Sequence, residues 1–328
     1  MALNRKPYSS VPLDMINPWK IKMQIIRMSK GNKKESDNLI EMVLLDSSGT
    51  RIHTTIDEAF SKWFMNIGNE KINEPKTEID ILEDLLITEC KDPIKTIVRQ
   101  VYGESFPQSF NPEEKAILCH TDVDVNQIND YMLSQLSDEE SVCYSADSIT
   151  PSHSSPDDYM LYPMELLNSI KVPGLPSHIL KLKVGAIVML LKDLDRYGGL
   201  CKGTRLQITR LNTFVLEARF IAGNKNGEKV LIPRVPSFPT DANFPIKMQR
   251  RQFPLTLAFA MSINESQGQS LSKVGLYLPR RVFSHGQMYV AISKVKSRDG
   301  LKILITDKDG KPQEETMNVV FKEVSQII

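Results

Sequence analysis

The segment from residue 253 to residue 298 constrains the fold of this chain more than any other. It begins with FPLTLAFAM (253–261), which reads as one strand with apolar side chains on both faces. A strand of that kind is typical of a buried position in a parallel sheet. The run ends in the polar loop NESQGQS (264–270), and a second apolar run (274–278) and a helical pattern (283–294) follow. Because open α/β sheets bind ligands at the carboxyl ends of their strands, the segment predicts an α/β fold with a parallel sheet and a ligand site beside the loop.

The composition excludes several classes of protein. Of the 328 residues, 41% are hydrophobic and 25% are charged, which is typical of a soluble globular chain long enough for two or three domains. No apolar run approaches the roughly 20 residues of a membrane span. The first residues lack the apolar core of a secretory signal, so we expect no membrane partner. The four cysteines are scattered without the paired spacing of a zinc site, so we expect no metal ligands among them.

Charge is distributed unevenly along the chain, although the formal net charge is only +1. Residues 57–170 contain 7 Lys or Arg against 23 Asp or Glu, whereas residues 171–256 contain 15 against 5. A basic segment next to an acidic one indicates that an anion binds at one place on the chain. It does not indicate a polyanion that covers the whole surface. The alternative is that the basic residues form a solvated face without a ligand.

Two motifs within this segment carry a resemblance to a known family. Residues 262–268 read SINESQG, and residues 286–294 read GQMYVAISK. They resemble the last two motifs of superfamily 1 DNA helicases of the petite-integration-frequency (PIF) type, in the family's order and at its spacing. The family typically has Lys where this chain has Glu265, and Arg where it has Lys294. The resemblance implies the C-terminal half of a PIF-type, Helitron-like helicase, with a second RecA-like domain of the P-loop NTPase type.

The resemblance also implies roles for single residues. It implies that Ser262 and Asn264 approach a DNA strand. It also implies that Gln267 and Gly268 approach the γ-phosphate of ATP. Glu265 reverses a charge beside the DNA path, which weakens contact with phosphate. Lys294 stands at the position of the catalytic arginine finger, where Lys lacks the rigid fork of a guanidinium. Arg298 follows about one helical turn later and would partly substitute for that finger.

Residues 171–254 are expected to form a small β-barrel, because apolar runs alternate there with Gly-rich turns. The string LKVGAIVMLLKDLDRYGGLCKGTRLQI (182–208) resembles the SH3-like insertion that interrupts the second RecA domain of PIF-type helicases. The arginines expected to contact the DNA backbone are Arg205, Arg210, Arg250 and Arg251. The alternative is that they are ordinary exposed charges of the barrel.

Residues 116–170 are expected to open the second RecA-like domain, which resumes at residue 255 and continues to residue 328. The short apolar strand 116–119 is followed by Thr121, which can cap a helix over residues 122–136. Strand, Thr cap and helix resemble the opening unit of a RecA-like domain. The hydroxyl and the backbone amides at such a helix start can hold a DNA phosphate. Capping alone is the alternative role of Thr121.

Residues 1–56 read as an antiparallel β unit of three strands. The string INPWKIKMQIIRM and the strands after it resemble the start of an oligonucleotide-binding (OB) domain in the large subunit of replication protein A. An OB barrel has five strands, so this is expected to be a partial unit. Residues 57–115 are expected to form an acidic, mostly helical linker, in which Phe60, Trp63 and Ile67 share one face of a helix.

Helicases of this family hydrolyse ATP with Mg²⁺ between two RecA domains, and the first domain supplies the phosphate loop G-x-x-x-x-G-K-[ST]. The chain contains no such loop: residues 223–229 have the wrong spacing, and residues 199–204 have Lys and Gly reversed. The first hypothesis is a PIF-type ATP-dependent DNA helicase family member, inactive unless a protein supplies the first RecA domain. The resemblance associates it with DNA replication, recombination, repair and telomere maintenance in the nucleus. The alternative is a non-catalytic module that binds single-stranded DNA or a protein partner.

Overall fold

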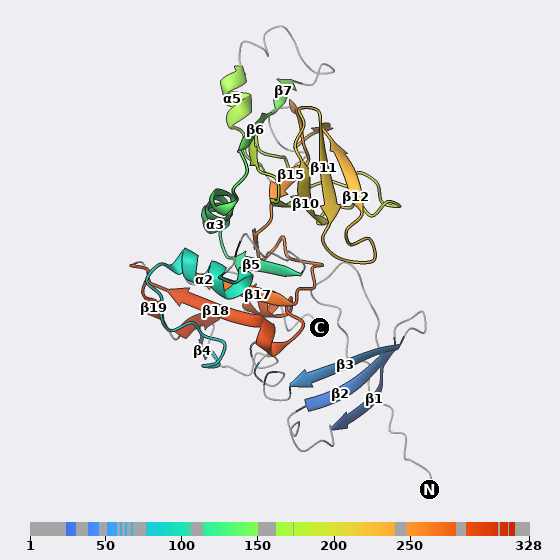
Figure 1. Cartoon of the computed structure of the whole chain (residues 1–328). Coiled ribbons are helices and arrows are strands. Elements are labelled where there is room, and N and C mark those ends of the chain that lie inside the picture. The colour runs from blue at the N-terminus through green and yellow to red at the C-terminus, as the bar shows by residue number, and fades with distance from the viewer. Residues whose placement is uncertain are drawn as a thin grey trace. The chain divides into compact units, whose positions relative to one another are not determined.

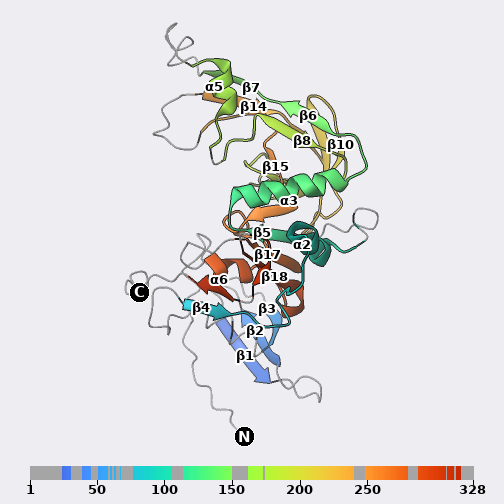
Figure 2. The same cartoon turned by 90° about the vertical axis from the view of Figure 1, so that its left-hand side faces the viewer.

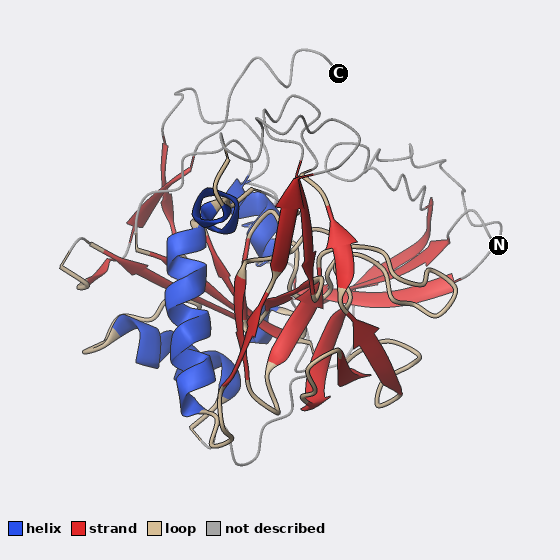
Figure 3. Cartoon of the chain, turned by 90° about the horizontal axis from the view of Figure 1, so that it is seen from above, coloured by secondary structure: helices blue, strands red, loops and turns tan. Residues whose placement is uncertain are grey.

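A computed structural model describes the chain in two compact units, Lys91–Tyr277 and Met1–Cys90 together with Leu278–Ile328. Helices and strands contribute to both (Figures 1 and 3). The described residues are 24–30, 39–45, 51–57, 60, 63, 67, 77–104, 106, 114–149, 162–172, 174–239, 248–279, 287–307, 309–313 and 315–318. Side chains are not described in 24–30, 39–45, 51–57, 77–80 and 315–318.

A parallel sheet lies in the unit Lys91–Tyr277. Its central strand β5 (Lys115–Cys119) pairs in parallel with β16 (Ala260–Ser262) and with β17 (Lys273–Leu278). Every residue from Ala116 to Cys119 is 0% exposed, which is why the sequence of this strand is apolar on both faces. The prediction of an α/β fold with a parallel sheet is confirmed.

Two helices pack against this sheet. α3 (Asp122–Gln135) follows β5 directly and packs against β5 and β16 (Figure 2). α2 (Pro93–Tyr102) packs against β5 and approaches β17 at Gly275. A β-carbon at residue 275 would lie only 2.5 Å from Val101 Cγ2, so a larger residue there would push α2 off the sheet.

The prediction of one strand over residues 253–261 is wrong. β15 (Leu255–Leu257) pairs antiparallel with β9 (Ile187–Leu190), whereas β16 pairs in parallel with β5. The chain therefore changes sheets between residues 257 and 260, and both sheets bury its apolar side chains. Asn129 on α3 holds this crossing: its Nδ2 donates to Ala260 O at 3.0 Å, and its Oδ1 accepts from Ala260 N at 2.8 Å.

β9 and β15 belong to a five-stranded antiparallel sheet with the order β12-β11-β10-β9-β15. Its other strands are β10 (Arg205–Arg210), β11 (Val215–Phe220) and β12 (Lys229–Pro233). The turn between β11 and β12 contains Gly223 and Gly227 with φ of 77° and 85°, a conformation that favours glycine. The Gly-rich turns therefore separate antiparallel strands, as predicted.

Two smaller sheets and a short helix complete this unit. The strands are β7 (Ala146–Ile149), β13 (Val235–Ser237) and β14 (Met248–Gln252) in the order β13-β14-β7, and β6 (Ser141–Tyr144) paired with β8 (Ile179–Leu182). α5 (Met164–Ser169) packs on β7, and Leu167 joins Ile149 and Met248 in a small apolar core.

The other unit contains a three-stranded antiparallel sheet, which confirms the β unit predicted near the N-terminus. Its strands are β1 (Gln24–Lys30), β2 (Leu39–Leu45) and β3 (Arg51–Asp57). Residues 16–23 of the OB-like string lie outside the described residues. In the expected linker, Phe60, Trp63 and Ile67 are helical, but β4 (Thr77–Asp80) is a strand that pairs with β20 (Glu315–Asn318).

The remaining described elements of this unit begin within the second family motif, residues 286–294. α6 (Gln287–Ile292) lies in the predicted helix, of which residues 283–286 are outside the described part. A 3₁₀ turn, η2 (Arg298–Gly300), leads to the hairpin of β18 (Leu301–Thr306) and β19 (Pro312–Gln313). None of the described helices is long and apolar enough to cross a bilayer.

Candidate functional site

The loop after β16 is built around a reciprocal cap. Ser262 N donates to Glu265 Oε2 at 3.1 Å, and Glu265 N donates to Ser262 Oγ at 3.3 Å. Ser266 N donates to Ser262 O at 3.1 Å, which closes one helical turn. This is the S-x-x-E capping box. The Ser262 side chain, expected at the DNA, is therefore mostly buried and faces its own loop.

The outer face of this loop carries three of the predicted site residues. Asn264, Gln267 and Gly268 are exposed, whereas Ser266, which lies between the first two, is 0% exposed. Gly268 has a φ of 81°, in the left-handed region that favours glycine. The loop thus presents two side-chain amides and an accessible backbone at the carboxyl end of a parallel strand.

A hydrogen bond ties this loop to the antiparallel sheet. Gln269 Nε2 donates to Gly203 O at 2.7 Å. A hollow with a volume of about 340 Å³ lies at this junction, between residues 268–271 of the loop and residues 202–205 and 221–223 of the sheet's connections. Sequence reasoning missed Gln269 and Lys202. The glycines around residue 203 were the available signal, but a Gly-rich turn does not identify the segment that it contacts.

Thr121 caps α3. Its Oγ1 accepts from Asp124 N at 3.3 Å and donates to Asp124 Oδ2 at 2.5 Å. The capping alternative therefore describes this side chain, and contact with a DNA phosphate stays a prediction. Thr121 lies two residues after the last residue of β5, so α3 begins immediately after the strand and packs against the sheet.

Arg205 is buried, contrary to the expectation that it contacts DNA. It is 6% exposed, and its Nη2 donates to Lys115 O at 2.8 Å and to Ala258 O at 2.9 Å. Burial lowers the pKa of this guanidinium, and its contact with Tyr102 works in the opposite direction. Arg205 therefore joins β10 to the start of β5 and to the crossing before β16, so its main contacts are with backbone carbonyls of its own unit.

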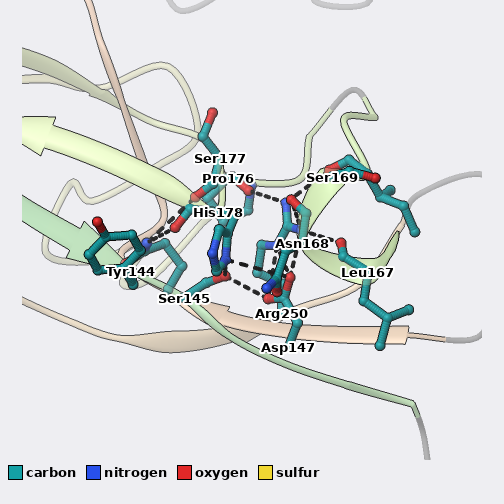
Figure 4. Close-up of polar contacts among 12 residues, drawn as sticks. Tyr144, Ser145, Asp147, Leu167, Asn168, Ser169, Pro176, Ser177, His178 and Arg250 are labelled. Atoms are coloured by element: carbon teal, nitrogen blue, oxygen red, sulfur yellow. Dashed lines mark hydrogen bonds and ion pairs between the residues drawn. The ribbon is translucent and has the colours of Figure 1, made fainter. Parts of the chain in front are cut away.

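Arg250 is also buried, contrary to expectation (Figure 4). It is 1% exposed, and its Nη2 lies 2.6 Å from Oδ2 of Asp147, whose side chain is 0% exposed. The same guanidinium donates to the backbone oxygens of Leu167, Ile170 and Pro176. These carbonyls belong to the end of α5 and the segment after it, where a helix leaves carbonyl groups without intrahelical partners. Arg250 is therefore a structural residue that fastens α5 to β7 and β14.

The other two arginines of the predicted set differ from these. Arg251 and Arg210 are exposed, on β14 and β10 respectively. Both side chains are accessible from solvent, as a contact with phosphate requires. Because side chains alternate along a strand, Arg250 and Arg251 point to opposite faces of β14, and only one of them reaches solvent.

The residues at the arginine-finger position lie in the other unit. Lys294 follows α6, is partly buried, and has its amine pKa lowered by that burial. Arg298 donates from Nε to Asp84 Oδ2 at 2.9 Å and from Nη2 to Asp84 Oδ1 at 2.7 Å. This hydrogen bond is the main reason that the pKa of Asp84 is lowered. The guanidinium fork of Arg298 is thus engaged by a carboxylate of its own unit.

Two known families match parts of the sequence. The family described as "DNA helicase Pif1, 2B domain" matches residues 165–211. The family described as "Domain of unknown function DUF223" matches residues 12–97. The first match covers β8, β9 and β10 completely, and the second covers the three-stranded sheet.

Two curated vertebrate proteins illustrate the similarity to known relatives. The ATP-dependent DNA helicase PIF1 of Danio rerio is 37% identical over 145 residues, which are 43% of this chain and 22% of that protein. The ATP-dependent DNA helicase PIF1 of Xenopus laevis is 30% identical over 235 residues, which are 71% of this chain and 34% of that protein. The chain spans about a third or less of the length of these relatives.

Solved structures agree with the fold. The crystal structure of the Pif1 helicase from Candida albicans has a TM-score of 0.54 at 23% identity, covering 83% of this chain and 57% of that one. A structure titled for DNA unwinding at forked dsDNA by two coordinating Pif1 helicases has a TM-score of 0.50 at 22% identity, covering 82% and 50%. At these identities the likeness shows a RecA-like mixed α/β fold. Taken with the motif loop after β16 and the curated relatives, it shows that this chain belongs to the PIF-type superfamily 1 DNA helicases.

Proposed function

We propose that this chain binds single-stranded DNA as the second motor portion of a PIF-type helicase. The observation that carries the proposal is the loop after β16, whose Asn264 is exposed at the carboxyl end of a parallel strand. Side-chain amides and backbone N–H groups are common partners of the sugar–phosphate backbone. Arg251 and Arg210 add exposed positive charge within the same unit.

The finer architecture is part of the proposal. We assign residues 116–170 and 255–328 to the second RecA-like domain, 171–254 to an SH3-like insertion, 1–56 to a partial OB unit and 57–115 to the linker. The antiparallel strands β9, β10, β11 and β12 and the 2B-domain match support the insertion, and β15 joins their sheet from residues 255–257. The sheet of β1, β2 and β3 supports the OB unit.

ATP and Mg²⁺ are the cofactors that the family implies, and the residues present do not fit a complete site. The sequence contains no G-x-x-x-x-G-K-[ST] loop, and no three His, Cys, Asp or Glu of the described residues are grouped so that they could hold a metal ion. We therefore propose that Gln267 and Gly268 contribute to a site that a second protein completes with the first RecA domain. Nuclear location and work in replication, recombination, repair and telomere maintenance follow from the family and belong to the same proposal.

Substitution of the loop tests the binding proposal. Asn264→Ala removes a hydrogen-bonding amide, so we expect its affinity for a fluorescein-labelled thymidine 12-mer to fall about tenfold in fluorescence anisotropy. Asn212→Ala, an exposed Asn in the connection between β10 and β11, is the matched control and should bind like the wild type. Equal affinity for Asn264→Ala and the wild type would remove Asn264 from the DNA surface.

A hydrolysis assay tests the second part of the proposal. The purified chain should show no release of phosphate from ATP and Mg²⁺ above background, with or without the oligonucleotide. DNA-stimulated hydrolysis by the chain alone would contradict the assignment of an incomplete site.

A further inference from the structure

Tyr197 is the most exposed large apolar side chain among the residues that the structure describes, at 101%. It lies in the connection between β9 and β10, residues 191–204. An aromatic ring stabilises a fold through the area that it removes from water, and this ring removes none. The ring therefore contributes little to folding through burial, and both of its faces are open to a ligand.

The ring stands on a connection that is held by its own hydrogen bonds. Leu194 N donates to Leu200 O at 2.8 Å, and Leu200 N donates to Asp195 O at 2.7 Å. Asp195 Oδ1 accepts from Gly198 N at 2.9 Å, and Lys225 Nζ from the turn between β11 and β12 donates to Gly198 O at 2.7 Å. Exposure of Tyr197 is thus a property of an ordered loop. A pre-ordered aromatic loses little conformational entropy when it binds a ligand.

The connection adjoins the loop of the proposed DNA site. Gly203, near its end, accepts the hydrogen bond from Gln269, and Lys202 lines the hollow between the two loops. Lys202 is exposed, and its backbone N–H donates to Asp193 Oδ1 at 2.7 Å. Arg196 is paired with Asp193 at 2.8 Å, and Lys192 Nζ donates to Pro236 O at 3.2 Å. One connection thus carries an open aromatic ring and an exposed lysine, and it is hydrogen-bonded to a loop of backbone and amide donors. These are components of a surface for single-stranded nucleic acid.

We infer that Tyr197 stacks on a base of single-stranded DNA while Lys202 contacts a neighbouring phosphate. This inference rests on the proposed function and extends the DNA surface from the motif loop onto the β9–β10 connection. Stacking on a phenol ring accepts every base, because every base has a π-face. The contact therefore adds affinity without adding sequence preference.

Three variants separate the two contacts. Tyr197→Ala should weaken binding of the labelled thymidine 12-mer about 5- to 100-fold, the range for one lost base–aromatic stack. It should leave the slope of log affinity against log salt unchanged, because stacking releases no counterion. Tyr197→Trp should bind like the wild type. Lys202→Ala should reduce the magnitude of the slope by about 0.7, the value for one phosphate contact on a single strand.

Phe214→Ala is the matched control. Phe214 is 80% exposed and lies in the connection at the other end of β10, away from Gly203 and the motif loop. Its removal should leave the affinity unchanged. An oligonucleotide that carries 2-aminopurine supplies a direct readout, since the fluorescence of this base is quenched on stacking. We expect quenching by the wild type and by Phe214→Ala, and none by Tyr197→Ala.

The outcomes distinguish the inference from the function on which it rests. If the wild-type chain binds the 12-mer, and Tyr197→Ala binds it equally well and quenches its fluorescence equally, the inference alone is overturned. A loss of affinity in Phe214→Ala equal to that in Tyr197→Ala also overturns it, because exposed aromatics would then act without regard to position. A wild-type chain that binds no DNA at low salt overturns the proposed function and the inference together.

Discussion

At the scale of single residues, the buried pair of Arg250 and Asp147 has the most to lose from substitution. Both side chains are shielded from water, and the guanidinium also satisfies carbonyl groups at the end of α5 (Figure 4). Removing one partner of such a pair leaves the other charge buried without compensation, which is costlier than the pair itself is stabilising.

Asp147→Ala should therefore lower the free energy of unfolding by about 3–5 kcal/mol in urea titration. Glu140→Ala is the matched control, because Glu140 forms an exposed ion pair with Lys181 at 3.5 Å. Its loss should change stability by less than about 1 kcal/mol. Similar effects of the two substitutions would show that Arg250 finds water or another acceptor when Asp147 is absent.

Substitution of Glu265 should change both the stability of the chain and its affinity for single-stranded DNA. It replaces the Lys of the family motif and caps its own loop through Ser262 N. Glu265→Lys should raise the affinity for single-stranded DNA and increase the salt slope by about 0.7, because it removes a negative charge and adds a phosphate contact. It should also lower stability by roughly 1 kcal/mol through loss of the cap.

Glu265→Gln separates these effects, since Gln also serves in a capping box and carries no charge. This variant should keep the wild-type stability and slope while binding DNA somewhat more tightly. Identical binding by Glu265→Lys and Glu265→Gln would mean that no phosphate passes near residue 265.

At the scale of elements, the crossing between β15 and β16 decides how the two sheets of the unit Lys91–Tyr277 share one segment. The sequence predicted the apolar character of residues 253–261 correctly, but a strand buried in either sheet has the same pattern. The fact that settles the crossing is the pair of hydrogen bonds from Asn129, 131 residues away from Ala260. The sequence shows that Asn129 is a polar residue at an inner position of α3. It does not show that its partner is the backbone of Ala260.

Asn129→Ala should cost about 1–3 kcal/mol, because it leaves the buried N–H of Ala260 without an acceptor. Asn126→Ala, an exposed position on the same helix, should change stability by less than about 0.5 kcal/mol. Chemical denaturation of the two variants makes the comparison. Equal stabilities would show that the crossing is held by apolar packing alone.

The segment 81–90 is fastened to η2 and β18 by Asp84 and by a bridge between Leu86 and Ile303. Because Arg298 lowers the pKa of Asp84 in the folded state, this pair adds stability above the unfolded pKa of about 3.9 and loses it as pH falls through the folded value. Arg298→Gln should thus unfold at a lower temperature than the wild type at pH 6. The difference should shrink below about pH 4, and a difference independent of pH would remove the ion pair as its cause.

At the scale of the whole molecule, the sequence predicted what depends on local pattern and missed what depends on distant partners. The parallel sheet, the Thr121 cap and the antiparallel strands follow from periodicity and turn residues that lie within a few positions of one another. The burial of Arg250 depends on Asp147, 103 residues earlier in the chain. The contact of the motif loop with Gly203 depends on a glutamine 66 residues later. An arginine on a predicted strand has the same appearance in the sequence whether it faces DNA or an internal carboxylate.

The central claim is that this chain keeps a DNA-binding surface of the PIF-type helicases. Fluorescence anisotropy of the wild-type chain with a labelled thymidine 12-mer, measured from about 20 to 300 mM salt, tests it most directly. We predict binding at low salt, with log affinity falling linearly against log salt at a slope of about −0.7 for each phosphate contacted. No binding at the lowest salt, or an affinity that salt leaves unchanged, would contradict the claim.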